Sequence, residues 1–128
     1  MQDLLREHLP GTVMLVEDGT AIRTLQRFLL SRTGLQVLDY ADVPEAEAAL
    51  MHFAPSVIVL DLNLPSGNGL SLLERIDRSV TKIVVMTSMA QEHVEEHCRN
   101  VADAFLSKPF DPDIFIETVQ ALLPLALA

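Results

Sequence analysis

Cysteine is nearly missing from this chain of 128 residues, because Cys98 is its only one. A single cysteine excludes an intramolecular disulfide and is typical of a protein in a reducing compartment. No stretch approaches the ~18 uninterrupted apolar residues of a membrane span, and residues 1–11 lack the basic start and apolar core of a signal peptide. The sequence therefore predicts a cytoplasmic protein without a membrane segment.

Basic residues are also scarce, with 9 Lys and Arg against 18 Asp and Glu and no basic cluster. Nucleic-acid binding through phosphates needs clustered Lys and Arg, so we expect no direct contact of this chain with DNA or RNA. Long Gly, Pro or polar tracts are missing too, which favours one globular domain. We expect that domain over residues 12–123, after an amphipathic lead-in (1–11) and before a short tail (124–128).

Apolar runs rich in β-branched residues alternate with helical patterns along the chain. The runs predict strands over residues 12–16, 36–40, 57–61, 82–86 and 104–107. The helical patterns predict helices over residues 20–33, 44–53, 70–78 and 91–99, and from 112 onward. Pro10-Gly11 is interpreted as a turn, and Ala54-Pro55 as the end of a helix. This alternation predicts an α/β fold, a parallel sheet with helices on both faces.

Two helices carry side-chain predictions of their own. Apolar residues recur at helical spacing in the first helix, at Ile22, Leu25, Phe28 and Leu29. Asp111 is the expected N-cap of the last helix, with Pro112 in its first turn. The residues of that helix expected to face the sheet are Ile114, Phe115, Val119 and Leu122.

Polar side chains follow the predicted strands where each strand ends. Asp61 follows the buried run 57–60, although on this stretch alone it is equally well explained as a turn residue. Right-handed crossovers bring the carboxyl ends of parallel strands to one edge of a sheet, where open α/β sheets bind ligands. The polar residues expected at that edge are Glu17, Asp18, Asp61, Thr87, Ser88 and Lys108.

Three carboxylates at one edge call for a compensating cation, because each close pair repels by roughly 4 kcal/mol at an effective dielectric near 20. Hard oxygen ligands with room for water favour Mg²⁺. The Asp61 carboxylate is then a potential nucleophile toward phosphorus, giving an aspartyl phosphate. Lys108 and Mg²⁺ would supply positive charge around the moving oxygens, and the Thr87 hydroxyl would donate a hydrogen bond to one of them.

Four motifs occur in a fixed order, VEDG (16–19), VIVLDLNLPSGNGL (57–70), VVMTS (84–88) and FLSKPF (105–110). With these motifs the chain from about Thr12 to Leu123 resembles the receiver domains of two-component response regulators. The resemblance implies a (βα)5 doubly wound, flavodoxin-like fold, with five parallel strands in the order 2-1-3-4-5.

The resemblance also implies a role for each residue at the site. Asp61 is implied as the phosphoacceptor and Asp18 as a direct Mg²⁺ ligand. Glu17 is implied as a ligand acting through water, and Asn63 as a ligand through its backbone carbonyl.

Other implied roles concern the phosphoryl group and the switch. Lys108 would pair with the phosphoryl group and with Asp61, and Thr87 would bind a phosphoryl oxygen. Phe105 would be the aromatic residue whose rotamer reports the switch. A cis peptide bond is implied between Lys108 and Pro109, and X-Pro bonds carry only a modest cis penalty.

The implied function is a phosphorylation-dependent signalling switch without enzymatic activity on other substrates. A sensor histidine kinase or a histidine phosphotransfer protein would phosphorylate Asp61, and the modified state would change the surface formed by the fourth helix, fifth strand and fifth helix. The downstream partner would be a protein target or a fused output domain, and a homodimer is also open. The chain is either a single-domain regulator or one module of a longer protein.

Three alternatives remain open beside this interpretation. A haloacid-dehalogenase-like phosphatase also pairs a nucleophilic Asp with Mg²⁺, but it carries a second acid where this chain has Asn63. A pseudo-receiver would lack site residues, and none is missing. His93, Glu96 and His97 match a zinc-peptidase pattern, H-x-x-E-H, without an obvious third ligand on that helix.

Overall fold

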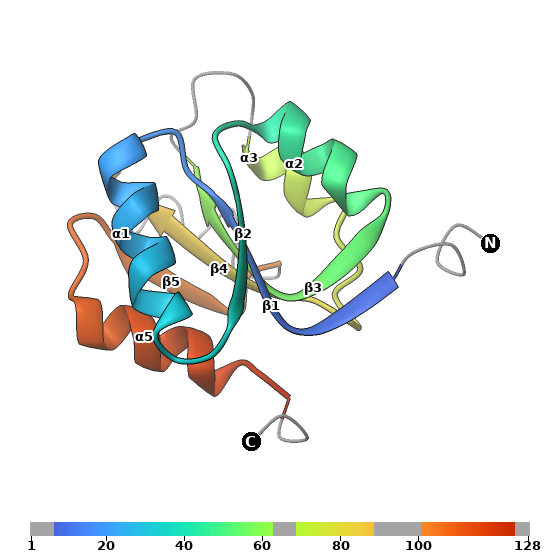
Figure 1. Cartoon of the computed structure of the whole chain (residues 1–128). Helices are drawn as coiled ribbons and strands as arrows, with labels where there is room; N and C mark the ends of the chain where they lie inside the picture. The colour runs from blue at the N-terminus through green and yellow to red at the C-terminus, as the bar shows by residue number, and fades with distance from the viewer. Residues whose placement is uncertain (1–6, 63–68, 89–100, 125–128) are drawn as a thin grey trace.

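The structure is a computed structural model that describes residues 7–62, 69–88 and 101–124. Within these residues, five parallel strands form one sheet in the order β2-β1-β3-β4-β5 (Figure 1). The predicted α/β fold with this strand order is confirmed. The strands are β1 (Glu7–Val16), β2 (Gln36–Tyr40), β3 (Phe53–Asp61), β4 (Lys82–Thr87) and β5 (Ala104–Ser107). The helices are α1 (Thr20–Ser31), α2 (Val43–Leu50), α3 (Gly69–Leu73) and α5 (Pro112–Ala121).

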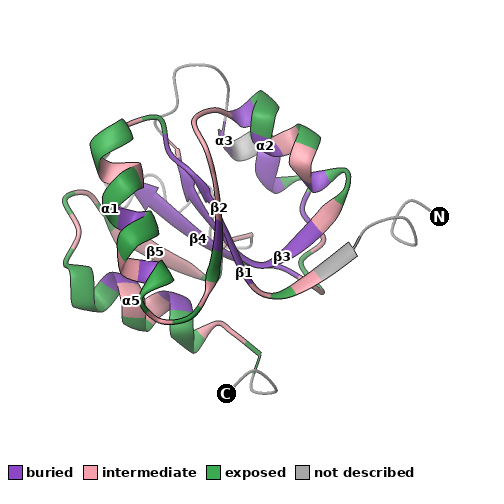
Figure 2. Ribbon diagram, viewed as in Figure 1, coloured by how far each residue is buried: buried purple, intermediate pink, exposed green. Residues whose placement is uncertain are grey.

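Helices cover both faces of the sheet, with α2 and α3 on one face and α1 and α5 on the other (Figure 1). Leu50 and Leu72 belong to the core on the first face, and Leu30 and Phe115 to the core on the second. Strands covered on both faces are expected to be apolar almost throughout, and the central strands are buried along most of their length (Figure 2). Among the described residues, no helix combines the length and apolar content that crossing a bilayer requires.

Strand β1 begins at Glu7, earlier than the sequence predicted, so the predicted turn at Pro10-Gly11 is wrong. These two residues lie within β1, where its pairing with β3 changes register between Leu9 and Val13. Gly11 has a φ of 74°, in the left-handed region that glycine adopts without strain. The Pro-Gly pair therefore marks an irregularity inside a strand, and part of the expected lead-in belongs to the sheet.

The predicted helix end at Ala54-Pro55 is also wrong, because α2 ends at Leu50 and both residues lie in β3. Proline has no N–H to donate to a ladder, so its carbonyl is the group that needs a partner. The Thr81 hydroxyl donates to the Pro55 carbonyl at 2.7 Å. A buried proline is therefore compatible with this strand.

Helix α3 is shorter than predicted and gives way to turns after Leu73. The following backbone bonds run from Arg75 N to Leu72 O and from Ile76 N to Leu73 O, which is the tighter i to i−3 pattern. The chain stays compact, and Leu72, Leu73 and Ile76 are buried on one side as the sequence indicated.

The buried stripes of α1 and α5 differ in part from the predicted pattern. In α1 the buried residues are Gln26 and Leu30, whereas Leu25 is 43% and Phe28 56% exposed. Gln26 and Leu30 are separated by one helical turn and share a face. A search for apolar spacing could not identify this face, because Gln26 is polar.

Helix α5 begins as predicted, because the Asp111 carboxylate accepts hydrogen bonds from the backbone N–H of Asp113 and of Ile114. Phe115 and Val119 are buried, but Ile114 is 52% exposed, so its predicted contact with the sheet is wrong. Ile114 lies beside the buried stripe that Phe115 and Val119 form one turn apart.

Some predictions concern residues outside those that the structure describes. These are the loop with Asn63, the helix expected over residues 91–99, its H-x-x-E-H pattern (His93, Glu96, His97) and Cys98. They stay predictions.

Candidate functional site

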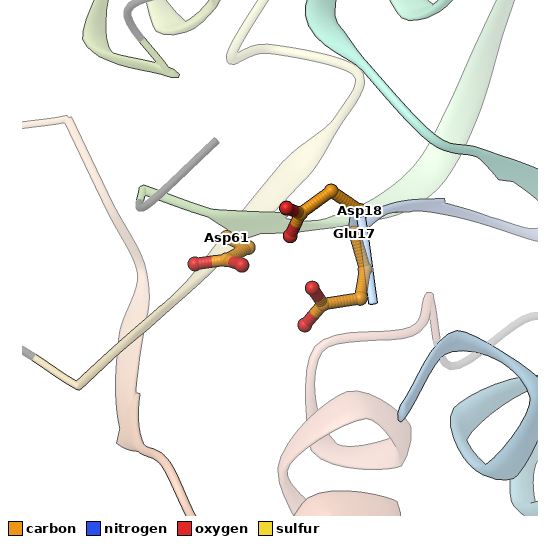
Figure 3. A group of neighbouring side chains, drawn as sticks. All are labelled: Glu17, Asp18 and Asp61. Atoms are coloured by element: carbon orange, nitrogen blue, oxygen red, sulfur yellow. The ribbon is translucent and has the colours of Figure 1, made fainter. Parts of the chain in front are cut away.

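Three carboxylates lie together beyond the ends of β1 and β3 (Figure 3). Glu17 and Asp18 directly follow β1, and Asp61 is the last residue of β3. β1 and β3 are adjacent parallel strands that end side by side. One oxygen of each carboxylate lies within 4.8 Å of the others. The structure thus brings together the three acids that the sequence placed at this edge.

Lys108 supplies a positive charge in direct contact with this cluster. Its Nζ lies 2.9 Å from Asp61 Oδ2 and 3.0 Å from Glu17 Oε1. Both acids have only 2% of their surface exposed, and buried charges need partners to be tolerated. The other Glu17 oxygen, Oε2, accepts a hydrogen bond from the Gly19 backbone N–H at 3.1 Å. One ammonium therefore serves two buried carboxylates, while Asp18 is exposed.

Burial and charge shift the pKa values of this group in identifiable ways. Burial raises the pKa of the Glu17 carboxyl above its ordinary 4.5, and nearby Asp61 raises it further, against the opposing hydrogen bonds from Gly19 and Lys108. Burial alone would lower the pKa of Lys108, but the bonds to Asp61 and Glu17 raise it above its ordinary 10.5. The ammonium is therefore charged at neutral pH, and the site carries excess negative charge.

Strand β4 brings Thr87 to the same edge. Asp61 is in register with Met86, the residue before Thr87, so the two side chains belong to neighbouring strand ends. Thr87 is buried, and its carbonyl accepts a hydrogen bond from the Lys108 N–H at 3.0 Å. Ser88, which follows, is exposed.

The remaining described residues of the predicted site lie in β5 or directly after it. The Lys108–Pro109 peptide bond is cis. Phe105 is partly buried and packs against the core that α2 and α3 cover. It is in register with Val85 of β4. Asn63 lies outside the described residues, so its predicted carbonyl contact remains a prediction.

Sequence reasoning missed a second layer of contacts behind the acids. Arg23 of α1 donates a hydrogen bond from Nη1 to the Glu17 backbone carbonyl at 2.7 Å, and its Nε lies 3.2 Å from Asp39 Oδ2 in β2. Arg23 reaches Glu17 and Asp39 because α1 packs over β1 and β2. No motif in the sequence joins these three residues, so no sequence signal could have identified the contacts.

The family model described as the response regulator receiver domain matches residues 13–120. The chain therefore belongs to the receiver domain family of response regulators, which act in two-component signal transduction, and the resemblance predicted from its motifs is confirmed. Membership places it among domains of phosphorylation-dependent signalling proteins.

Particular relatives agree with this assignment. The phosphate regulon transcriptional regulatory protein PhoB of Escherichia coli K12 is 30% identical over 118 residues, covering 87% of this chain and 51% of PhoB. The chain spans about half the length of the curated relatives it matches.

Solved structures of receiver domains share the fold. Chemotaxis protein CheY4 of Vibrio cholerae superposes with a TM-score of 0.81 at 27% identity, covering 90% of this chain and all of CheY4 (100%). A CheY-like receiver domain from Methanospirillum hungatei gives a TM-score of 0.80 at 25% identity, covering 88% of this chain and 93% of that one.

Proposed function

We propose that this chain is a phosphorylation switch in which Asp61 accepts a phosphoryl group from a histidine kinase or a histidine phosphotransfer protein. The observation that carries the proposal is the 2.9 Å contact between Lys108 Nζ and Asp61 Oδ2 inside a cluster of three carboxylates. A nucleophilic carboxylate beside a fixed cation, at the edge of the sheet where ligands bind, suits phosphoryl transfer, which needs alignment and positive charge.

The residues present fit Mg²⁺. Three carboxylate oxygens lie within 4.8 Å of one another, and the exposed Asp18 leaves the site open to water, which Mg²⁺ retains in its shell. Asp18 and Asp61 would bind the ion directly, Glu17 through water, and Asn63 through its carbonyl. When bound, Mg²⁺ would neutralise charge on the oxygens of the transferred group.

In the transfer step an oxygen of the Asp61 carboxylate forms a bond to phosphorus while the bond from phosphorus to the donor histidine nitrogen breaks. The electron pair of that bond returns to the imidazole ring. The Lys108 ammonium, already beside Asp61, would pair with a phosphoryl oxygen, and the Thr87 hydroxyl would donate a hydrogen bond to another.

The modified state would differ from the unmodified one through these new contacts. Bonds from the phosphoryl group to Thr87 and Lys108 would favour one of two pre-existing arrangements of the strand ends. Phe105 is partly buried in the neighbouring strand β5, and its rotamer would follow the change. The surface altered would be that of β5, α5 and the helix that the sequence predicts over residues 91–99.

The proposed partners follow from the same interpretation of the chain as a phosphorylation switch. A downstream protein or a fused output domain would bind the altered surface in the cytoplasm, and a homodimer is one form that this surface allows. The length of PhoB relative to this chain is compatible with a fused output domain.

Acetyl phosphate provides the direct test, since it donates a phosphoryl group without a kinase. We expect the protein to gain one phosphoryl group in the presence of Mg²⁺, measured by intact-mass spectrometry, and Asp61→Asn to gain none. The matched control is Asp113→Asn, which removes an exposed carboxylate on α5 and should leave uptake unchanged. Uptake by Asp61→Asn would contradict the proposed acceptor, and steady turnover of a phosphomonoester would favour a phosphatase instead.

A further inference from the structure

The main chain of Glu17 is held at both of its polar groups. Its N–H donates to the Tyr40 carbonyl of β2 at 3.0 Å, and its carbonyl accepts from Arg23 Nη1 at 2.7 Å. That carbonyl belongs to the planar peptide unit that joins Glu17 to Asp18. A contact to the carbonyl oxygen therefore fixes the orientation of the unit from which the Asp18 side chain projects.

Arg23 is itself held in place from the opposite side. Its Nε lies 3.2 Å from Asp39 Oδ2, and the two side chains are only 19% and 26% exposed. A guanidinium group presents several donors in a rigid plane, so it bonds a carboxylate and a carbonyl at the same time. Arg23 thereby connects α1, the end of β1 and the carboxyl end of the edge strand β2.

We propose that Arg23 is a positioning residue for the cation site, acting on Asp18 through the Glu17–Asp18 peptide. This inference rests on the proposed function, because it assigns Arg23 a role in the Mg²⁺ site of the switch. The Glu17 and Asp61 carboxylates are buried and contact Lys108, whereas Asp18 is exposed and its place depends on the main chain. Mutation of a residue that orients a metal ligand typically lowers metal affinity by about 10- to 100-fold.

Arg27 is a matched control on the same helix. It also pairs with Asp39, through Nη1 and Oδ1, but it is 52% exposed, and within residues 7–62, 69–88 and 101–124 its only polar contact through the side chain is the one to Asp39. Removing Arg27 takes away a positive charge and an ion pair with Asp39. The bond from Arg23 to the Glu17 carbonyl stays in place. The Arg27 variant therefore measures the effect of lost charge and lost stability on Mg²⁺ binding, without any change in the positioning of Asp18 by Arg23.

The test compares Mg²⁺ dissociation constants of the full chain, measured by isothermal titration calorimetry. We expect Arg23→Gln to weaken Mg²⁺ binding by about tenfold or more, and Arg27→Gln to leave it within about twofold, because exposed ion pairs contribute little. Arg23→Lys should stay close to Arg23→Gln, because an ammonium restores the charge but not the two-sided contact. A merely structural role would lower the melting temperature of these variants without separating their Mg²⁺ constants.

Equal Mg²⁺ constants for Arg23→Gln and Arg27→Gln would overturn the inference. If Arg23→Gln does not fold, Asp39→Asn replaces it, since this variant removes the carboxylate that orients Arg23. It should also bind Mg²⁺ more weakly than Arg27→Gln, and an equal constant would again overturn the inference.

The outcomes for the proposed function are distinct. Uptake of a phosphoryl group by the wild-type protein, together with equal Mg²⁺ constants in the variants, would reject only the role of Arg23. If the wild-type protein binds Mg²⁺ but takes up no phosphoryl group, Asp61 is rejected as a phosphoacceptor. The Mg²⁺ dissociation constants of the variants would then still decide the role of Arg23. A wild-type protein that binds no Mg²⁺ would reject both.

Discussion

Glu17 and Lys108 share one buried environment, and burial is the largest single influence on the pKa of each, yet both pKa values lie above their ordinary values. For the carboxyl, loss of solvent is the largest cause and disfavours the charged form. For the ammonium, burial acts in the lowering direction, but the hydrogen bonds and charge interactions with Asp61 and Glu17 together outweigh it and favour the charged form. Folding therefore disfavours the charged form of the Glu17 carboxyl and favours the charged form of the Lys108 ammonium.

The raised pKa of Glu17 predicts a pH dependence of stability in Mg²⁺-free buffer. Between 4.5 and the raised pKa, the folded state binds a proton that the unfolded chain has released. The free energy of unfolding contributed by Glu17 therefore falls as the pH rises through this interval. Urea unfolding followed by circular dichroism at several pH values should show this decline in the wild-type protein relative to Glu17→Gln.

The control for this measurement is Glu117→Gln, which removes an exposed carboxyl on α5. Its profile should keep the decline of the wild-type protein. Parallel profiles for the wild-type protein and Glu17→Gln would show that burial of Glu17 does not affect stability in this way.

At the scale of single elements, α1 carries an unusual buried amide. Gln26 is 1% exposed, and its Nε2 donates to Met86 Sδ at 3.2 Å. Its Oε1 has no hydrogen-bond partner among the described residues. Sulfur is a weak acceptor and an unpaired buried oxygen is costly, so this amide destabilises the packing of α1 on the sheet.

We expect Gln26→Leu to raise the free energy of unfolding by about 1 kcal/mol, because it removes a buried polar group that lacks a full set of partners. Chemical denaturation at neutral pH measures the change. Gln120→Leu, at an exposed position of α5, should stay within about 0.5 kcal/mol of the wild-type protein. A Gln26→Leu variant less stable than the wild-type protein would mean that the contact to Met86 outweighs the unpaired oxygen.

How well each element was predicted depends on how local its determinants are. β2 and β5 match the predicted bounds, and the apolar runs correctly predicted strands within β3 and β4, although β3 begins earlier than expected. Pro10-Gly11 and Ala54-Pro55 misled because proline and glycine report local preference, whereas pairing between β1 and β3 decided their conformation. The same limit applies at the site, where strand ends identified the acids but the bond from Arg23 to Glu17 depends on tertiary packing.

On the scale of the whole molecule, the chain carries an excess of negative charge, and part of that charge is concentrated at one site. The chain has a formal net charge of −9, and three of its carboxylates gather at one end of the sheet with a single lysine between two of them. Their mutual repulsion opposes folding in the absence of a cation. A cation that binds only the folded state is therefore expected to stabilise the entire domain.

Mg²⁺ should accordingly raise the melting temperature of the protein in a concentration-dependent way. At one hundred times the dissociation constant, the stabilisation would be about 2.7 kcal/mol. Differential scanning calorimetry with MgCl₂, against NaCl at matched ionic strength, measures it. Asp18→Asn should lose most of the shift, and an equal response to the two salts would indicate screening without a specific site.

The position of Lys108 has a consequence for how the strands are connected. This residue follows β5 at one edge, yet its ammonium contacts carboxylates at the ends of β3 and β1, with β4 between β5 and β3. The Lys108 side chain thus links the end of β5 to the ends of two strands that are not its neighbours, in addition to the link through the ladder with β4. If the ammonium turned toward a phosphoryl group, this link between the strand ends would change at the same moment as the charge of the site.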